Sequence, residues 1–337
     1  MFDEQKLLPI WYGDASPGFG LRALSALFGA LVAMRRGLYR LGILRSFRLP
    51  VPVVVVGNIS VGGTGKTPLT IALVEALRER GFSPGVVSRG YSGSAAGSQI
   101  LDANPDPVIV GDEPVVVARA TGAPVAIGSD RVSAARLLLA RGVDVIIADD
   151  GLQHYRLRRN VEICVIDGAR RFGNARLLPA GPLREPVARL GNVDFRVCNG
   201  VNAGAGEVPM QLVGDSAVNI GDPQRQRALL DFSGQRVHAV AGIGNPQRFF
   251  SRLRAYGIDL VEHAFADHHA YCADDLSFGD DAAVLMTQKD AVKCVAFARA
   301  SWWYVPVAAK LPPEFLDAVA GRLRWHRSAR SRYSADS

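Results

Sequence analysis

The chain has few of the features that mark secreted or membrane-spanning proteins. Its longest charge-free apolar run near the start, Ala23–Met34, has 12 residues, whereas a bilayer-spanning helix needs about 20. Asp3 and Glu4 stand where a secretory signal would carry positive charge. Cysteine is scarce, and no C-x-x-C pair occurs among Cys164, Cys198, Cys272 and Cys294. We therefore expect no transmembrane helix and no signal peptide, and reduced, mostly buried thiols as in a cytosolic protein.

The composition is that of an ordinary globular protein. The 337 residues are 48% hydrophobic and 21% charged, which excludes a disordered or fibrous chain and suggests roughly two domains. Lysine and arginine number 39 against 32 acidic residues, a net charge of +7. This excess favours an anionic partner: nucleic acid, a phosphorylated substrate or an acidic membrane surface.

From residue 51 onward, β-branched apolar runs alternate with helical patterns. This alternation predicts an α/β fold with a doubly wound, mostly parallel sheet, of the P-loop NTPase-like kind, whose ligand lies at the carboxyl ends of the strands. The expected strands are Val53–Val56, Gly85–Val87, Val125–Ile127, Val143–Ala148, Ile163–Ile166 and Phe195–Cys198. The expected helices are Leu69–Glu79, Glu113–Ala120 and Ser133–Ala140.

The small and polar stretch after residue 199 predicts a domain boundary. We expect a core over 49–200, a linker over 201–224, a smaller α/β lobe over 225–325 and a solvated basic tail over 326–337, fraying from Arg322 onward. The lobe is expected to hold strands Val237–Ile243, Ala283–Thr287 and Trp302–Val305 and a helix near Gln247–Ala255.

Residues 1–48 carry an amphipathic helix. On a helical wheel its apolar side is formed by Leu24, Leu27, Leu31, Met34, Leu38 and Leu41. Arg22, Arg36 and Arg40 lie opposite. Such a helix suits an anionic membrane surface, but it would equally suit packing of the apolar side on the protein's own core.

A phosphate-binding loop is the sharpest motif. Ser60-Val61-Gly62-Gly63-Thr64-Gly65-Lys66-Thr67 follows a strand and precedes a helix, and it differs from the P-loop pattern only in having serine first. Its glycines let successive backbone N–H groups turn toward phosphate oxygens. Lys66 is expected to reach the terminal phosphates and the Thr67 hydroxyl a Mg²⁺ ion. Asp149 and Asp150, at the end of another strand, supply candidate carboxylates for that ion.

Two further groups carry chemistry that the spacing alone leaves open. Asp112 and Glu113 open a helix, as a cap and a first-turn acid do, but a kinase also needs an acid beside the acceptor hydroxyl. Asp267-His268-His269 suits an acid–base pair, a metal site or an ordinary surface. Basic residues after strand ends suggest a cationic rim: Arg89, His154, Arg156, Arg158, Arg159, Arg170, Arg171 and Arg184.

These features leave two classes of function. One is a kinase for a phosphorylated, membrane-associated substrate, and the other is a P-loop GTPase or ATPase that works as a switch or chaperone. Thr287-Gln-Lys-Asp290 has its lysine out of register with the guanine-reading [NT]-K-x-D pattern. Nucleic-acid binding ranks last because no recognised motif for it occurs.

The string of motifs resembles the tetraacyldisaccharide (lipid A disaccharide) 4'-kinase family of Gram-negative lipid A biosynthesis. The resemblance spans most of the chain, and Gln288 stands where the family usually has glutamate. It rests on VGNISVGGTGKTP (56–68), SRGY (88–91), GDEP (111–114), DDGLQH (149–154), LLPAGPLREP (177–186), GIGNP (242–246), DHHxY (267–271) and TQKD (287–290).

The resemblance implies transfer of the ATP γ-phosphate to the 4'-hydroxyl of a tetraacylated glucosamine disaccharide 1-phosphate, at the cytoplasmic face of the inner membrane. Asp112 is then the expected base, assisted by His268 as oriented by Asp267. The resemblance also implies that Mg²⁺ is bound by Thr67, Asp149, Asp150 and Glu113. It implies that the substrate is contacted by Arg89, His154, Arg170 and Arg171. The N-terminal helix is expected to dock on the bilayer.

Overall fold

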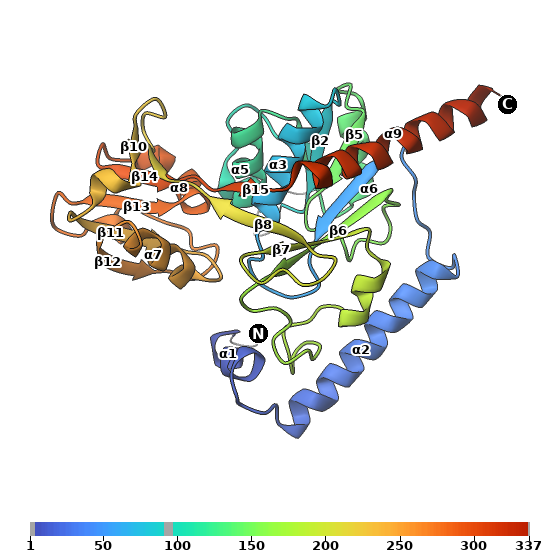
Figure 1. Ribbon diagram of the computed structural model, residues 1–337, viewed down its shortest axis with the longest axis horizontal. Helices are drawn as coiled ribbons and strands as arrows, with labels where there is room; N and C mark the ends of the chain where they lie inside the picture. The colour runs from blue at the N-terminus through green and yellow to red at the C-terminus, as the bar shows by residue number, and fades with distance from the viewer. Residues whose placement is uncertain (1–3, 91–96, 336–337) are drawn as a thin grey trace.

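Two α/β lobes lie side by side in the computed structural model (Figure 1). The structure describes residues 4–90 and 97–335, with side chains for 6–90 and 97–326, so Tyr91 of the SRGY motif lies outside the described residues. Within these ranges the strands form a nine-stranded and a six-stranded sheet. The doubly wound, mostly parallel α/β fold expected from the sequence is confirmed.

The first sheet places the P-loop strand at its centre. Its order is β15-β8-β7-β6-β1-β5-β2-β4-β3, with parallel pairs from β8 to β4 and antiparallel pairs at the two edges. Its strands are β1 (Val53–Gly57), β2 (Pro84–Ser88), β3 (Gln99–Ile100), β4 (Val125–Ile127), β5 (Val145–Ala148), β6 (Val161–Asp167), β7 (Phe195–Asn199), β8 (Val208–Val213) and β15 (Ala308–Lys310).

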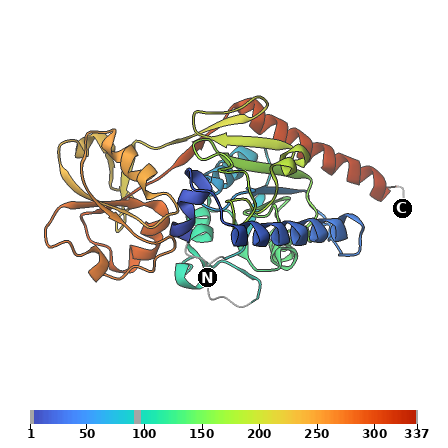
Figure 2. The ribbon, with the colours of Figure 1, turned by 90° about the horizontal axis from the view of Figure 1, so that it is seen from below.

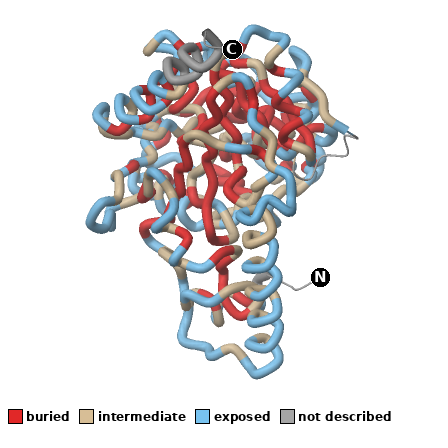
Figure 3. The backbone as a smooth tube through the Cα atoms, turned by 90° about the vertical axis from the view of Figure 1, so that its right-hand side faces the viewer, coloured by how far each residue is buried: buried red, intermediate tan, exposed pale blue. Residues whose placement is uncertain are grey.

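Helices cover both faces of this sheet, which explains why its strands are nearly continuous apolar runs. On one face, α3 (Lys66–Glu79), α5 (Asp112–Thr121) and α9 (Pro313–Ala335) pack on side chains such as Val54 and Ile147. On the other face lies α6 (Arg131–Leu139). The buried interior of the lobe is visible in Figure 3.

The second sheet has the order β10-β9-β14-β13-β11-β12. Helix α7 (Pro246–Arg254) covers one face of it and α8 (Gln288–Cys294) the other. Its strands are β9 (Ser216–Asn219), β10 (Gln226–Ala228), β11 (Arg236–Ala241), β12 (Asp259–Ala264), β13 (Ala283–Thr287) and β14 (Trp302–Val305).

The predicted boundaries need correction. Residues 201–224 are not simply a linker, because β8 belongs to the first sheet and β9 to the second. The smaller lobe does not extend to residue 325, since β15 pairs with β8 and α9 packs on the first lobe. The chain therefore crosses between the lobes twice, once after β8 and once before β15.

The C-terminal segment is also more ordered than predicted. Helix α9 runs to Ala335 rather than fraying from Arg322, because Val319 and Leu323 are fully buried in the core of the first lobe. Arg322 pairs with Asp194. Of the cysteines, Cys164, Cys198 and Cys294 are buried as expected, whereas Cys272 is exposed.

The N-terminal region forms two helices rather than one. Helix α1 (Glu4–Tyr12) is anchored by Trp11, which is buried and donates from Nε1 to the Pro179 carbonyl at 2.9 Å. Helix α2 (Phe19–Arg40) lies along the outside of the first lobe (Figure 2) and has no buried residue. No helix in the described part of the chain is both long and apolar enough to cross a bilayer.

The apolar side of α2 faces away from the protein. Leu24, Leu27, Leu31 and Met34 are each 46–58% exposed. The other side of the helix makes the contacts with the lobe: the Ser25 hydroxyl donates to the Leu177 carbonyl, and Arg36 lies 3.8 Å from Glu185. The alternative in which the apolar side packs on the protein's own core is therefore excluded for these four residues.

Candidate active site

The P-loop forms a turn between the buried strand β1 and the first turn of α3. Gly62 and Gly65 have φ angles of 94° and 95°, a region that residues with a Cβ rarely adopt. The Asn199 side chain donates to the Thr64 carbonyl at 2.9 Å and holds the loop from outside. The Thr64 Oγ1 is buried without a hydrogen-bond partner, which fits a loop shaped to receive an anionic oxygen.

Two adjacent carboxylates at the end of β5 lie beside Lys66. Asp150 is 3.6 Å from Lys66 Nζ and 3.2 Å from Arg184 Nη1. Burial would raise the pKa of Asp150, but these two charges outweigh it and hold the pKa below its ordinary value. Asp149 accepts from the Thr70 hydroxyl at 3.0 Å, and burial, with the nearby charges of Glu113 and Asp150, raises its pKa to about 7.

This surplus of carboxylate oxygen fits a hard divalent cation. Burial and neighbouring negative charge disfavour ionisation of Asp149, and a cation would relieve that repulsion. In the described ranges, no group of three or more His, Cys, Asp or Glu side chains is arranged to hold a metal by itself. Magnesium suits such a site, because it is usually held by one or two carboxylates together with phosphate oxygens and water.

Asp112 and His268 meet across the boundary between the lobes. Asp112 begins α5 in the first lobe and is buried, and its Oδ2 lies 3.0 Å from Nδ1 of His268. Burial by itself would raise the pKa of Asp112. The hydrogen bond with His268 and the charges of Lys289 and Lys293 outweigh burial and hold the pKa below its ordinary value. Asp112 is therefore an ionised carboxylate at neutral pH.

Asp267 lies in the same cluster, but it contacts the backbone of His268 rather than the ring: its Oδ1 accepts from the His268 backbone N–H at 3.1 Å. Its Oδ1 is 3.9 Å from His268 Nε2, beyond hydrogen-bond distance, and 3.1 Å from Lys289 Nζ. Lys289 is the residue that sequence reasoning missed. The TQKD motif was compared with a guanine-reading pattern and counted toward the family resemblance, but no role was given to its lysine, which contacts acids of both lobes.

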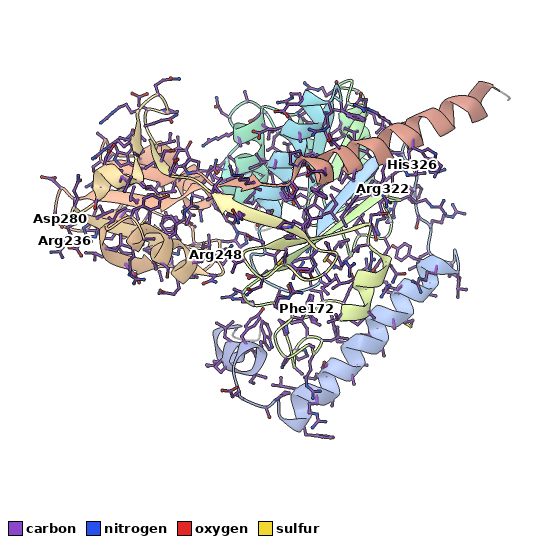
Figure 4. The ribbon with its side chains drawn as sticks, in the orientation of Figure 1. Phe172, Arg236, Arg248, Asp280, Arg322 and His326 are labelled. Atoms are coloured by element: carbon purple, nitrogen blue, oxygen red, sulfur yellow. The ribbon has the colours of Figure 1, made fainter. Side chains whose placement is uncertain are left out.

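A loop of the second lobe lies close to both this cluster and the P-loop. A Cβ placed on Gly244 would lie 3.6 Å from the Gly63 nitrogen and 3.7 Å from Asp267 Oδ2. Arg248 of α7, which lies between the lobes in Figure 4, donates to Asn199 at 2.9 Å. The phosphate loop and the Asp112–His268 pair therefore border one site.

The four residues expected at the substrate do not all lie free for that role. Arg171 makes two hydrogen bonds with Glu207, at 2.7 and 2.8 Å. Arg170 lies 5.1 Å over the Tyr12 ring and reaches the Gly244 carbonyl at 3.5 Å. Arg89 is exposed just after β2. Arg171 is therefore held by Glu207, whereas Arg170 reaches the loop of Gly244 and Arg89 follows a strand that ends at the same edge of the sheet as β1.

His154 lies beside a cationic residue that was not expected from the sequence. Burial, then the charge of Arg131, lowers the pKa of His154 to about 4, and its Nε2 is buried without a partner. Arg131 is buried at the start of α6, and its Nε also has no partner. Burial lowers the pKa of Arg131 to about 10, with a smaller contribution from Arg89. An orphaned guanidinium donor of this kind is typical of a site built for an anion.

Comparison with known proteins identifies the family. The family model described as "Tetraacyldisaccharide-1-P 4'-kinase" matches residues 18–324. A protein of Stenotrophomonas maltophilia (strain R551-3) named tetraacyldisaccharide 4'-kinase is 52% identical over 326 residues, covering 94% of this chain and 96% of its own. The chain belongs to this family.

Other members of the 4'-kinase family match over similar lengths. A tetraacyldisaccharide 4'-kinase of Methylobacillus flagellatus is 50% identical over 315 residues, covering 93% of this chain and 94% of its own. The crystal structure of LpxK from Aquifex aeolicus in complex with ATP superposes with a TM-score of 0.75 at 27% identity, covering 90% of this chain and 96% of that one. The match confirms the P-loop fold.

Gln288, the departure from the family motif, lies outside the cluster of Asp112, His268 and Lys289. Together with Ile71, Gly214 and Arg252 it lines a cavity of about 780 Å³ where the chain crosses between the lobes. The missing acid therefore leaves the contacts of Lys289 in place.

Proposed function

We propose that the protein transfers the γ-phosphate of ATP to the 4'-hydroxyl of a tetraacylated glucosamine disaccharide 1-phosphate, giving a bisphosphorylated lipid A precursor. The observation that carries this proposal is the approach of Gly244 to both Gly63 and Asp267, since it brings the loop of His268, the partner of Asp112, beside a phosphate-binding loop. Phosphoryl transfer needs that adjacency, because the acceptor hydroxyl attacks in line with the leaving group.

The residues divide the work by position. The P-loop amides and Lys66 hold the triphosphate, with Ser60, Val61, Gly62, Gly63, Thr64, Gly65 and Thr67 completing the loop. Magnesium, held by Thr67, Asp149, Asp150 and Glu113 together with phosphate oxygens, would neutralise charge on the phosphates. Asp112 accepts the proton of the sugar hydroxyl, and His268 holds Asp112 in place through their 3.0 Å contact.

A direct assay tests the reaction. We expect labelled ATP and the acylated disaccharide 1-phosphate to give a labelled bisphosphorylated lipid. Label found only in free inorganic phosphate would instead support the switch or chaperone type of P-loop NTPase.

The substrate's existing phosphate suits the cationic group around Arg131 and His154. The residues of this group follow strands that end at the same edge of the sheet as β1, the strand before the P-loop. Arg89 contributes to the positive charge of the group. Because the Nε of Arg131 is a donor without an acceptor, a phosphate there would satisfy it.

Removing the exposed arginine of this group should weaken lipid binding. We expect Arg89→Gln to raise KM for the disaccharide 1-phosphate about tenfold while KM for ATP stays within twofold, because a charge-assisted contact contributes about 1.5–3 kcal/mol. Steady-state kinetics with each substrate varied in turn measure this. Arg141→Gln, an exposed arginine at the opposite edge of the sheet, is the control. If Arg89→Gln and Arg141→Gln had the same KM for the disaccharide 1-phosphate, Arg89 would not contact the lipid phosphate.

Helix α2 is proposed to bring the enzyme to the cytoplasmic face of the inner membrane as a peripheral protein. Its exposed leucines and the arginines of the same region, Arg22, Arg35 and Arg40, suit an anionic bilayer. The substrate's acyl chains lie in that bilayer, so docking would bring the sugar to the site without extracting the lipid.

Substitution of the exposed leucines tests docking without disturbing the fold. We expect Leu24→Gln/Leu27→Gln/Leu31→Gln to lower binding to anionic phospholipid vesicles more than about tenfold, since each buried leucine contributes about 2 kcal/mol. Vesicle co-sedimentation measures it. Val201→Gln, at a residue 90% exposed elsewhere, is the control. Deleting residues 1–45 would be less clean, because it also removes the buried Trp11. Unchanged sedimentation of the triple variant would contradict docking through α2.

A further inference from the structure

Lys289 lies at the centre of the cluster that contains Asp112 and His268, and each N–H of its ammonium group has an acceptor. Its Nζ lies 3.1 Å from Asp267 Oδ1, 3.4 Å from Glu113 Oε1 and 3.4 Å from His268 Nε2. An ammonium has three N–H donors, and these three atoms accept them. Glu113 belongs to the first lobe and the other two acceptors to the second, so one side chain joins both halves of the site.

The contact with His268 determines which imidazole nitrogen carries the proton. An ammonium can only donate, so the Nε2 that faces it must present its lone pair. The hydrogen of the neutral ring then lies on Nδ1, which donates to Asp112 Oδ2 at 3.0 Å. We propose that Lys289 is a positioning residue that fixes this tautomer of His268 and thereby leaves Asp112 as the proton acceptor. The inference rests on the proposed function of Asp112.

The ring needs such a partner because its own backbone does not restrain it within a regular element. His268 lies in a loop with φ of 62°, in the left-handed region, and its backbone N–H donates to the Asp267 side chain at 3.1 Å. Lys289, by contrast, stands on a helix. Further along α8, Val292 is buried against Val115 and Val116 of α5. This apolar contact between the lobes holds the ammonium of Lys289 at a fixed position relative to Asp112. The helix therefore restrains the imidazole, which its own loop does not.

Burial of Lys289 is compatible with a permanent charge. Its side chain is 19% exposed, and the carboxylates of Asp267 and Glu113, at 3.1 and 3.4 Å from Nζ, supply the opposite charge that a largely buried ammonium requires. A neutral amine would present a lone pair to His268, whereas the charged group presents only hydrogens. The direction of the contact is therefore fixed at neutral pH.

Nitrogen NMR of ¹⁵N-histidine-labelled protein tests the proposal apart from catalysis. We expect His268, identified by loss of its signals in His268→Gln, to show a protonated Nδ1 and an unprotonated Nε2 in the parent protein. Lys289→Met should lose this preference and lower kcat about 30-fold, with KM for ATP within twofold. Lys289→Arg, which keeps the donors, should retain the tautomer and recover most of the turnover. Lys310→Met, at an exposed lysine of β15, should match the parent protein.

Other outcomes would overturn the inference. A Lys289→Met protein that keeps the Nδ1–H tautomer shows that the lysine does not orient the ring. If KM for ATP rises while the tautomer is unchanged, Lys289 acts through Glu113 instead. Should Lys289→Met fail to fold, an Nε2–H tautomer in the parent protein or in Lys289→Arg is equally decisive. Turnover that survives in Asp112→Asn would overturn the proposed base, whereas the NMR result would still decide the role of Lys289.

Discussion

Asp112→Asn should lose turnover by a factor of about 10²–10⁴ while ATP binding stays within about twofold of the parent protein. An amide keeps the shape of the carboxylate but cannot accept a proton, and general-base catalysis is worth about that factor. The nucleotide should be unaffected because the loop that holds it is anchored elsewhere, by Asn199 and by strand β1. Initial rates at saturating substrates give kcat, and calorimetric titration with ATP gives Kd.

The design of this test depends on the three N–H donor groups around the carboxylate. His268, Lys289 and Lys293 all lie within 3.9 Å of Asp112 Oδ2, so Asp112→Ala would leave them without this oxygen acceptor and mix a structural effect with the chemical one. The isosteric amide limits that effect. Glu79→Gln, at a carboxylate 76% exposed on α3, controls for loss of a negative charge. Turnover of Asp112→Asn within threefold of the parent protein would exclude Asp112 as the base.

Local sequence predicted the elements and loops that depend on neighbouring residues. Strand β1, the P-loop and the start of α3 are specified by one continuous stretch, because glycine at Gly62 and Gly65 permits the positive φ that the turn requires. The acids at Asp149 and Asp150 follow from the same logic, since a buried parallel strand must end at the ligand edge of the sheet. The resemblance to the kinase family added the roles of Asp112 and His268.

Contacts between distant segments were not predictable in this way. The return of β15 to the first sheet depends on its pairing with β8, nearly a hundred residues earlier, and each is a short strand without a distinctive pattern. Likewise, Arg131 lay outside every motif and every helix expected from the sequence, and only the fold brings it beside His154. Asp267 was expected to orient His268, and its carboxylate accepts from the backbone N–H of that residue rather than from the ring, while it also lies 3.1 Å from Lys289. Which of several nearby groups a side chain contacts depends on differences of about an ångström in the folded protein. The spacing of residues along the chain does not determine them.

Lys66→Met should abolish measurable nucleotide binding and lower kcat/KM for ATP by more than about 10³, or about 4 kcal/mol. The lysine supplies the point charge that meets the terminal phosphates in a P-loop. Here it has a second effect, because its Nζ is 3.6 Å from Asp150 and its charge also lowers the pKa of Asp149. Without it, triphosphate would enter a site whose carboxylates are less compensated, so repulsion adds to the lost attraction.

A comparison of two substitutions separates these two effects. Lys66→Arg keeps the positive charge beside Asp149 and Asp150 but replaces a compact ammonium with a broad guanidinium, so it should retain more nucleotide affinity than Lys66→Met and yet turn over slowly. Calorimetry and initial rates on both variants, with Lys310→Met as control, measure the difference. If Lys66→Met binds ATP as tightly as the parent protein, then the nucleotide's phosphates do not lie against this loop. The functional proposal would then be wrong at its foundation, because the base at Asp112 would have no phosphate beside it.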